Sequence, residues 1–313
     1  MPAADATSGF DAFFAREIAP WIAEKEVERR AVFRRTVWRA APIIGTGLVA
    51  FAVSAQAIEG EDMRGFALFA SVAIMVAGAA MFGSVLLWGR KFAEELSAKI
   101  FGHFGYAYSP DVPADFLEPF NRCHLLPGYS RKSLEDHVRG EAGGVPFELA
   151  EAFLERKVRR DKRDEYDLVF RGIVARYRFP KRFSGRTVLR ADQGLLNALG
   201  HSGVSGERVR LEDPRFEKLF EVFSSDQVEA RYLLTPAFME RMTALAETTA
   251  APLQAAFEGG ELLIAIDGRR GYFAQPSPWR DLGRGDHIRA FVEDIELIGD
   301  IAATLKLDTQ TAV

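Results

Sequence analysis

Two apolar stretches near the N-terminus constrain the fold of this chain most strongly. Ala40–Ile58 gives nineteen residues without a charge, and Gly65–Gly89 gives twenty-five more after a short polar gap. At 1.5 Å of rise per residue, helices over these ranges would measure about 28 and 37 Å, against about 30 Å of bilayer hydrocarbon. Since strands would leave backbone groups unpaired in lipid, the sequence predicts two transmembrane helices joined by a loop over 59–64.

Two other interpretations of these stretches fit less well. Buried helices of a soluble core rarely lack every charge over such lengths. A cleaved signal peptide would not follow a long and mostly polar N-terminal segment such as residues 1–39. We therefore expect a multi-pass protein in contact with a lipid bilayer.

Basic residues near the spans predict the orientation of this hairpin. Such residues flank it on both sides: Arg29, Arg30, Arg34, Arg35 and Arg39 before the first span, and Arg90, Lys91 and Lys99 after the second. The intervening loop has one arginine against three acids. By the positive-inside rule, both termini are expected in the cytosol of a bacterial cell, with the hairpin in its inner membrane.

The side chains within the spans are typical of an anchor. Neither span contains Asp, Glu, Lys, Arg or His, the residues that mark ion or proton paths through a membrane. Small residues four positions apart are expected to let helices approach closely. These are Thr46, Ala50 and Ser54 in the first span, and Ala73, Ala77, Ala79 and Gly83 in the second.

Residues 1–39 predict a cytosolic amphipathic helix. Apolar residues recur at three- and four-residue spacing, and Pro20 predicts a kink or a restart. They are Phe10, Phe13, Phe14, Ile18, Trp21 and Ile22. This stripe could lie in the lipid headgroup layer, dock on the chain's own globular domain, or extend the first span.

Residues 100–313 are expected to form one cytosolic domain of the α+β class with an antiparallel sheet. Alternating apolar residues and Gly-rich turns predict its strands: Leu134–Gly140, Phe147–Arg156, Asp167–Phe179, Gly185–Arg190, Leu253–Phe257, Leu262–Ile266 and Tyr272–Gln275. A C-terminal helix from near Asp286 would place Ile288, Phe291, Val292, Ile295, Ile298, Ala302 and Leu305 on one face. A pleckstrin-homology-like barrel is a variant of the same class.

Four polar residues are candidates for chemistry. Asp213, Asp226, Glu229 and Arg231 could form an acid/base pair with an anion clamp, as in an unrecognised membrane-bound enzyme. Helix starts explain most of the same residues. Asp213-Pro214 and Thr235-Pro236 each match a cap residue followed by proline, and Ser224 with Gln227 has the capping-box spacing.

A basic segment is the second candidate site. Residues 156–190 hold thirteen Lys or Arg and four Asp or Glu, a net charge of +9 in a chain whose total is −4. Its densest part is expected in a loop between two strands: Arg156, Lys157, Arg159, Arg160, Lys162 and Arg163. Such a loop could contact anionic lipid headgroups or stay in solvent, and both remain open. Nucleic-acid binding is not expected, because the chain is acidic overall and has no motif for it.

The sequence contains few residues suited to a metal or cofactor site. The single cysteine, Cys123, excludes a disulfide framework, and five scattered histidines offer little for a metal site. No phosphate-binding loop, nucleophile elbow or zinc-protease motif occurs in the sequence. We expect no cofactor, and the sequence leaves open whether the protein is an enzyme.

Three sequence blocks carry a family resemblance. They are Phe170-Arg171-Gly172 with Phe179–Gly185, then Leu211-Glu212-Asp213-Pro214-x-Phe216-Glu217-x-Leu219-Phe220, then Asp226-Gln227-Val228-Glu229-Ala230-Arg231-Tyr232-x-Leu234-Thr235-Pro236. With them the chain resembles an uncharacterised bacterial membrane-protein family, a domain of unknown function behind a transmembrane hairpin. The resemblance implies no activity, cofactor or catalytic residue, and it suggests a LemA-type membrane protein as a partner.

The first functional hypothesis is a membrane-anchored interaction module. In this hypothesis the cytosolic domain binds protein partners or anionic lipid. The alternatives are the membrane-bound enzyme described above and an accessory subunit of a transport or envelope complex. In the last case, small-residue faces of the hairpin would pack on a partner's helices.

Overall fold

The chain packs into two compact units in a computed structural model. The structure describes residues 10, 12–57, 60–142, 144–160, 163–179, 183–191, 206–268, 279 and 282. One unit comprises 1–96 with 275–287, and the other comprises 97–274 with 288–313.

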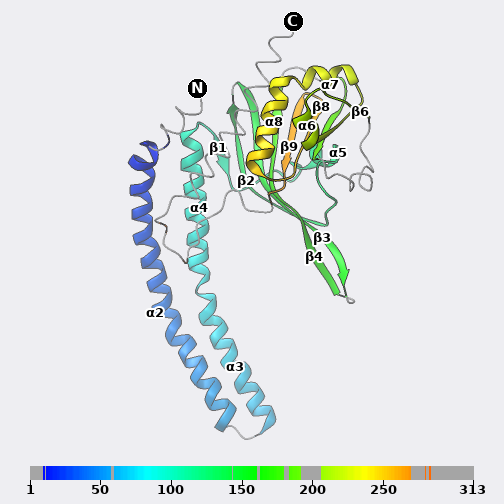
Figure 1. Cartoon of the computed structure of the whole chain (residues 1–313). Coiled ribbons are helices and arrows are strands. Elements are labelled where there is room, and N and C mark those ends of the chain that lie inside the picture. Colours follow the sequence, from blue (N-terminus) through cyan, green and yellow to red (C-terminus); the bar gives the residue numbers. More distant parts are fainter. Residues whose placement is uncertain are drawn as a thin grey trace. The chain divides into compact units, whose positions relative to one another are not determined.

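Long helices build the first unit (Figure 1). They are the π-helical turn η1 (Phe14–Ile18), α2 (Ala19–Ala57), α3 (Glu61–Ala80) and α4 (Gly83–His103). The N-terminal stripe extends the first apolar stretch, because α2 is one helix through both, and the expected break at Pro20 is replaced by the π-helical turn before it. Trp21 of this stripe stacks on Phe92 of α4, with 5.1 Å between ring centroids. Helix α3 begins at Glu61, within the range expected for the connecting loop.

Close contact between α2 and α3 depends on two glycines. A Cβ on Gly47 would lie 2.6 Å from Met75 Cγ, and one on Gly78 would lie 2.6 Å from Ile44 Cγ1. Ser54 is buried as expected, but Thr46 and Ala73 are exposed. The close packing that the small-residue spacing predicted therefore occurs, with its tightest contacts at Gly47 and Gly78.

The apolar surface of the hairpin is mostly uncovered. Two helical stretches, Phe14–Gln56 and Glu61–His103, are long and apolar enough to cross a membrane, and their most apolar windows are only 17% and 11% buried. Val49 and Phe69, for example, are 65% and 73% exposed. A core helix of a soluble protein would be mostly buried, so this exposure indicates membrane association.

The second unit contains a nine-stranded antiparallel sheet in the order β1-β2-β3-β4-β9-β8-β5-β7-β6. Its strands are β1 (Ala107–Ser109), β2 (Arg131–Ala142), β3 (Val145–Arg160), β4 (Arg163–Arg178), β5 (Thr187–Ala191), β6 (Glu207–Val209), β7 (Phe220–Ser224), β8 (Leu253–Glu258) and β9 (Glu261–Ile266). The α+β class is therefore confirmed. In the described chain β1 and β6 end the sheet without pairing to each other, so the barrel variant finds no support.

Some predicted elements differ from the observed ones. Strands β1, β6 and β7 have no counterpart among the predictions, whereas the remaining six match predicted strands. The strand expected over Tyr272–Gln275 and the helix expected from Asp286 lie outside the described residues.

Helices and loops cover both faces of the sheet. On one face, Phe116 and Phe120, the latter in α5 (Glu118–Arg122), pack with Ala150 and Val174 in the buried core. On the other, α8 (Pro236–Thr249) packs against the sheet through Phe238, whose ring centroid lies 5.4 Å from that of Phe257 on β8 (Figure 1). Two short helices, α6 (Pro214–Leu219) and α7 (Gln227–Leu233), complete the unit.

Glycine is required where β4 meets the end of β9. A Cβ on Gly172 would overlap the carbonyl oxygen of Ile266. Next to it, the backbone N–H of Arg171 donates to Asp267 Oδ1 at 3.2 Å. This close approach gives a structural reason for glycine in the Phe170-Arg171-Gly172 block.

Candidate functional site

Two of the candidate carboxylates cap helices. Asp213 Oδ1 accepts the backbone N–H groups of Arg215 and Phe216, at 2.9 and 3.1 Å, at the start of α6. Asp226 Oδ1 accepts those of Val228 and Glu229, both at 2.9 Å, at the start of α7. Each carboxylate satisfies N–H groups that have no partner within the helix.

The other predicted helix starts have mixed outcomes. Thr235 caps α8 as predicted, because its Oγ1 accepts the N–H of Phe238 at 3.2 Å. The capping box beginning at Ser224 is wrong by two residues, since Asp226 is the cap. Ser224 forms the turn before it and accepts the N–H of Asp226 at 3.0 Å.

Glu229 holds together two blocks that are distant in sequence. Its carboxylate accepts the backbone N–H groups of Ser184 and Gly185, each at 2.7 Å. The neighbouring Ser225 Oγ accepts the N–H of Arg186 at 2.9 Å. Arg231, by contrast, is exposed, and among the described residues its guanidinium donates to the carbonyl of Gln227 at 3.5 Å. Of the four candidates, the three carboxylates therefore accept backbone N–H groups.

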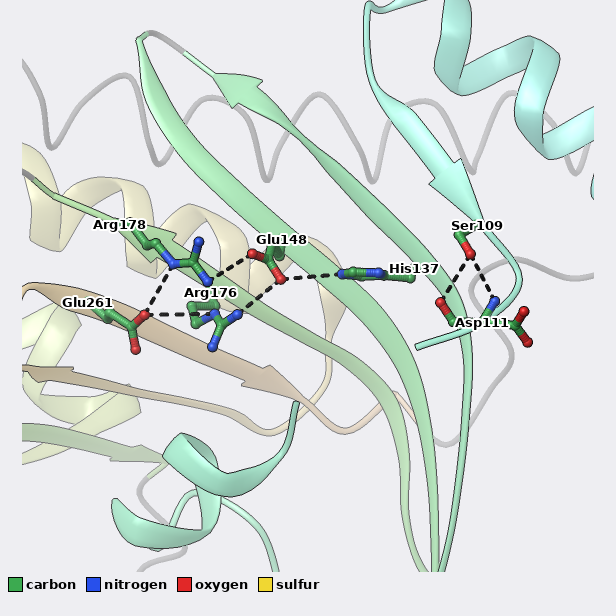
Figure 2. A network of polar contacts seen from close by, with 7 residues as sticks. All are labelled: Ser109, Asp111, His137, Glu148, Arg176, Arg178 and Glu261. Carbon is green, nitrogen blue, oxygen red and sulfur yellow. Dashed lines mark hydrogen bonds and ion pairs between the residues drawn. The ribbon is translucent and has the colours of Figure 1, made fainter. Parts of the chain in front are cut away.

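A network of charged side chains that the sequence did not predict lies on the sheet (Figure 2). Glu148 on β3 accepts from Arg176 at 3.0 Å and pairs with Arg178 at 2.9 Å, both on β4. Glu148 Oε2 also lies 3.3 Å from Nε2 of His137 on β2. Arg178 continues the network to Glu261 on β9 at 3.4 Å. Side chains from four strands are thus linked through the carboxylates of Glu148 and Glu261.

A β-bulge directs His137 into this network. The pairing of β2 with β3 shifts between Glu135 and Val138, and Asp136 has a φ of 58°, in the left-handed region. Asp136 is buried and accepts a hydrogen bond from the Tyr108 hydroxyl at 2.6 Å. Bulges of this kind turn side chains out of the regular alternation of a strand. Beside the network in Figure 2, the hydroxyl of Ser109 on β1 bonds to the backbone of Asp111.

The protonation states of the network favour a fixed ion pair. Burial by itself would raise the pKa of Glu148, but the charges of Arg176 and Arg178 outweigh it and lower that pKa below its ordinary value. Burial lowers the pKa of His137, although the hydrogen bond to Glu148 opposes this effect. At neutral pH an ionised Glu148 is therefore shared by two arginines and a neutral imidazole. An occupied carboxylate of this kind is a poor general base.

Cys123 is buried beside a second group of charged side chains. Burial is the main cause that raises the pKa of its thiol to about 12, and the nearby carboxylate of Glu258 adds to the effect. Arg122 and Arg186 bind the same carboxylate. Cys123 is therefore a packed thiol without nucleophilic character. In the chain as far as the structure describes it, no group of His, Cys, Asp or Glu side chains is suited to hold a metal ion.

The basic segment forms a ribbon of two strands instead of the expected loop. Arg156–Arg160 ends β3, and Arg163–Asp167 begins β4. The pairing of β2 with β3 ends at Glu155, and that of β9 with β4 begins at Ile173. The segment 156–167 is here called the basic ribbon. Its described parts, 156–160 and 163–167, extend beyond the neighbouring strands (Figure 1).

Acidic residues of the basic ribbon neutralise part of its charge. It contains six basic and four acidic residues. Lys157 pairs with Asp164 at 2.7 Å, and Arg160 pairs with Asp167 at 2.9 Å. The exposed arginines 156, 159 and 163 have no acidic partner among the residues that the structure describes. These three guanidinium groups are available to an external anion.

Comparisons with known proteins find a family model that matches part of this chain. A solved structure, the crystal structure of the mycobacterial trehalose monomycolate transport factor A, TtfA, matches with 12% identity over 68% of this chain and 95% of that chain. Its TM-score of 0.35 is too low to support a conclusion. No curated protein matches the chain. The family model described as "Protein of unknown function (DUF3137)" matches residues 168–307, so this part of the chain carries the domain of an uncharacterised family, as the sequence blocks implied.

Proposed function

We propose that this chain is a non-enzymatic interaction module anchored in the bacterial inner membrane. The observation that carries the proposal is that one chain contains two unlike units. One presents apolar helices with little buried surface, and the other is a separately packed sheet domain. The carboxylates expected to do chemistry bind backbone N–H groups, which favours an interaction role over an enzymatic one.

The topology in this proposal follows from the flanking charges. Basic residues are concentrated before the first apolar stretch and after the second, and acids dominate the connection between them. With both termini in the cytosol, the sheet domain would lie at the cytosolic face of the membrane.

The basic ribbon is the proposed contact surface. Arginines 156, 159 and 163, which have no acidic partner in the described chain, offer planar donors for phosphate or carboxylate groups. An anionic lipid or an acidic surface of a membrane-protein partner would bind there. A LemA-type protein is one such partner in this proposal. In the described chain no further strand pairs with the edges of the ribbon, which also offer backbone groups to a partner strand.

Photocrosslinking in native membranes tests this surface. A photoreactive amino acid replaces Arg159 on the ribbon, or Val228 on α7 as a control that is 79% exposed. We expect lipid or a discrete protein to be captured from position 159 and not from 228. The triple variant R156E/R159E/R163E, analysed by crosslinking from position 158, should lose the adduct. No adduct at 159, or equal adducts at both positions, would contradict the proposal.

A second candidate function is that of an accessory subunit in a larger membrane complex. A shallow groove on α2 favours it, lined by Pro42, Gly45, Thr46, Val49, Ala50, Val53 and Ser54. Most of these residues do not contribute to the contact with α3, so a partner helix could pack there. Replacing Thr46 and Val49 with leucine and phenylalanine should then release a co-purifying membrane protein while the ribbon crosslinks persist.

A further inference from the structure

The two apolar stretches of the hairpin end at different levels along its axis. The side chains of Thr36 on α2 and Ser84 on α4 lie 3.0 Å apart and mark one level. Arg39 lies three residues from Thr36 toward the α2–α3 connection, and Arg90 lies six residues from Ser84 in the opposite direction. At 1.5 Å per residue, the two basic boundaries differ in level by about 14 Å.

A single boundary of the hydrocarbon core can therefore not coincide with both Arg39 and Arg90. A boundary at Arg90 would place Arg34, Arg35 and Arg39 inside the hydrocarbon. These three side chains are exposed and have no acidic partner in the described chain. Unpaired arginine is costly at such depth. A boundary at Arg39 leaves residues 82–89 outside the hydrocarbon, and these carry no charge.

A break in the second helix lies at the level of Arg39. The α-helical pattern stops between α3 and α4, where Met81 and Phe82 donate to Gly78 and Ala79 over three-residue steps, at 3.2 and 3.0 Å. From this level to the α2–α3 connection, α2 runs from Ala40 to Ala57. These residues span about 27 Å, close to the hydrocarbon thickness of about 30 Å.

Around the break, apolar and basic side chains are exposed together. Trp38 is 77% exposed on α2, and Leu86 and Leu87 are 54% and 64% exposed on α4. With Arg34, Arg35 and Arg39 they make up what we call the collar. Tryptophan and arginine are enriched where a helix passes through lipid headgroups, because both combine apolar and polar parts.

We propose that the collar lies in the headgroup layer of an anionic bilayer, and that the hydrocarbon core ends at Ala40 and Met81 instead of at Gly89. This inference rests on the proposed membrane anchoring and specifies its depth. Two observations favour lipid as the occupant. The collar is continuous with the apolar surface of the hairpin, and its three arginines complement phosphate groups. The helices beyond it would then form a stalk outside the membrane.

Fluorescence depth measurement tests the collar. The full chain with Leu87→Cys or Val76→Cys is labelled with an environment-sensitive fluorophore and reconstituted in vesicles of phosphatidylcholine and phosphatidylglycerol. Cys123 stays in place, because it is buried and unreactive. Nitroxide lipids labelled at the headgroup or deep in the acyl chain then quench the fluorophore.

The collar predicts opposite quenching at the two positions. Position 87 should be quenched more strongly from the headgroup, and position 76 more strongly from the acyl chain. Removing the charges with R34Q/R35Q/R39Q should weaken the preference of position 87 for spin-labelled phosphatidylglycerol over phosphatidylcholine by at least about fivefold.

Other outcomes would overturn the inference in distinguishable ways. Deep quenching at both positions would extend the span to Gly89 and leave the anchor intact. Protection of position 87 from lipid and aqueous quenchers alike would mean that a protein covers the collar. If an aqueous quencher also reaches the fluorophore at position 76, the proposed membrane anchoring is wrong, and so is the position assigned to the collar.

Discussion

Glu148 on β3 and Arg176 on β4 are cross-strand partners whose side chains form a 3.0 Å ion pair, and His137 reaches the same carboxylate oxygen. Glu148 and Arg176 are each only 16% exposed at the side chain. The Glu148–Arg176 ion pair therefore links the β2 bulge to the middle of the sheet. Water has little access to it.

Neutralising Glu148 should destabilise the sheet domain. In Glu148→Gln the guanidinium of Arg176 loses its main partner, and a partly buried charge left unpaired costs about 3 kcal/mol of unfolding free energy. Urea unfolding of the full chain in detergent, followed by tyrosine and tryptophan fluorescence, measures this change. Arg178→Gln is the matched control, because Arg178 is half exposed and its loss should cost about 1 kcal/mol or less. Equal costs for the two variants would contradict the assigned roles.

Glu26 should make the helical unit sensitive to acid. Hydrogen bonds from Arg29 are the main cause that lowers its pKa to about 2, and Arg30 and the backbone N–H of Leu282 add to them against the effect of burial. A carboxylate with a lowered pKa stabilises the fold above its ordinary pKa, and this contribution disappears as the pH falls toward 2. We expect wild type to exceed Glu26→Gln in unfolding free energy by about 3 kcal/mol at pH 7.

Titration of both proteins from pH 7 to pH 2 checks this prediction. The difference between wild type and Glu26→Gln should begin to shrink near pH 4.5 and become small at pH 2. A difference that stays constant over this range would mean that the charge of Glu26 has no part in the stability of the unit.

Cys123 should resist alkylation in the folded protein. With a thiol pKa of about 12, almost none of it is thiolate at pH 8. Iodoacetamide should therefore react more than about 1,000-fold more slowly than with a thiol of ordinary pKa. Val228→Cys supplies the comparison within the same molecule, because that position is 79% exposed. Rapid modification of Cys123 without denaturant would show that its site opens or is wrongly described.

Glu229 should matter for stability and Arg231 should not. In Glu229→Gln the amide can accept one of the two N–H groups at Ser184 and Gly185, and its NH₂ group faces the other, so we expect a loss of about 2 kcal/mol. Arg231→Ala removes only a long contact at the surface and should change stability by less than about 0.5 kcal/mol. Thermal unfolding measured by circular dichroism separates the two. A neutral Glu229→Gln would leave that carboxylate without a structural role.

Features set by local chemistry could be predicted from the sequence. The apolar stretches, the caps at Asp213 and Thr235 and the longer strands each depend on neighbouring residues, and the structure bears them out. Strands β1 and β6 were missed because three residues carry no periodic pattern, and only pairing with a longer strand defines them.

The Glu148 network could not be predicted, because its members come from β2, β3, β4 and β9 and meet only through strand register. The basic ribbon was mistaken for a loop since charge suggested solvent. Oppositely charged residues on facing strands, such as Lys157 and Asp164, instead support the pairing.

Protease protection of the intact cell tests the central claim, that the hairpin crosses the membrane and leaves the sheet domain inside. Spheroplasts that produce the full chain with a C-terminal epitope are treated with protease before and after the membrane is opened. We predict that the epitope and residues 97–313 survive in intact spheroplasts and are digested once detergent is added. Digestion in intact spheroplasts would place the domain outside the cell and contradict the account.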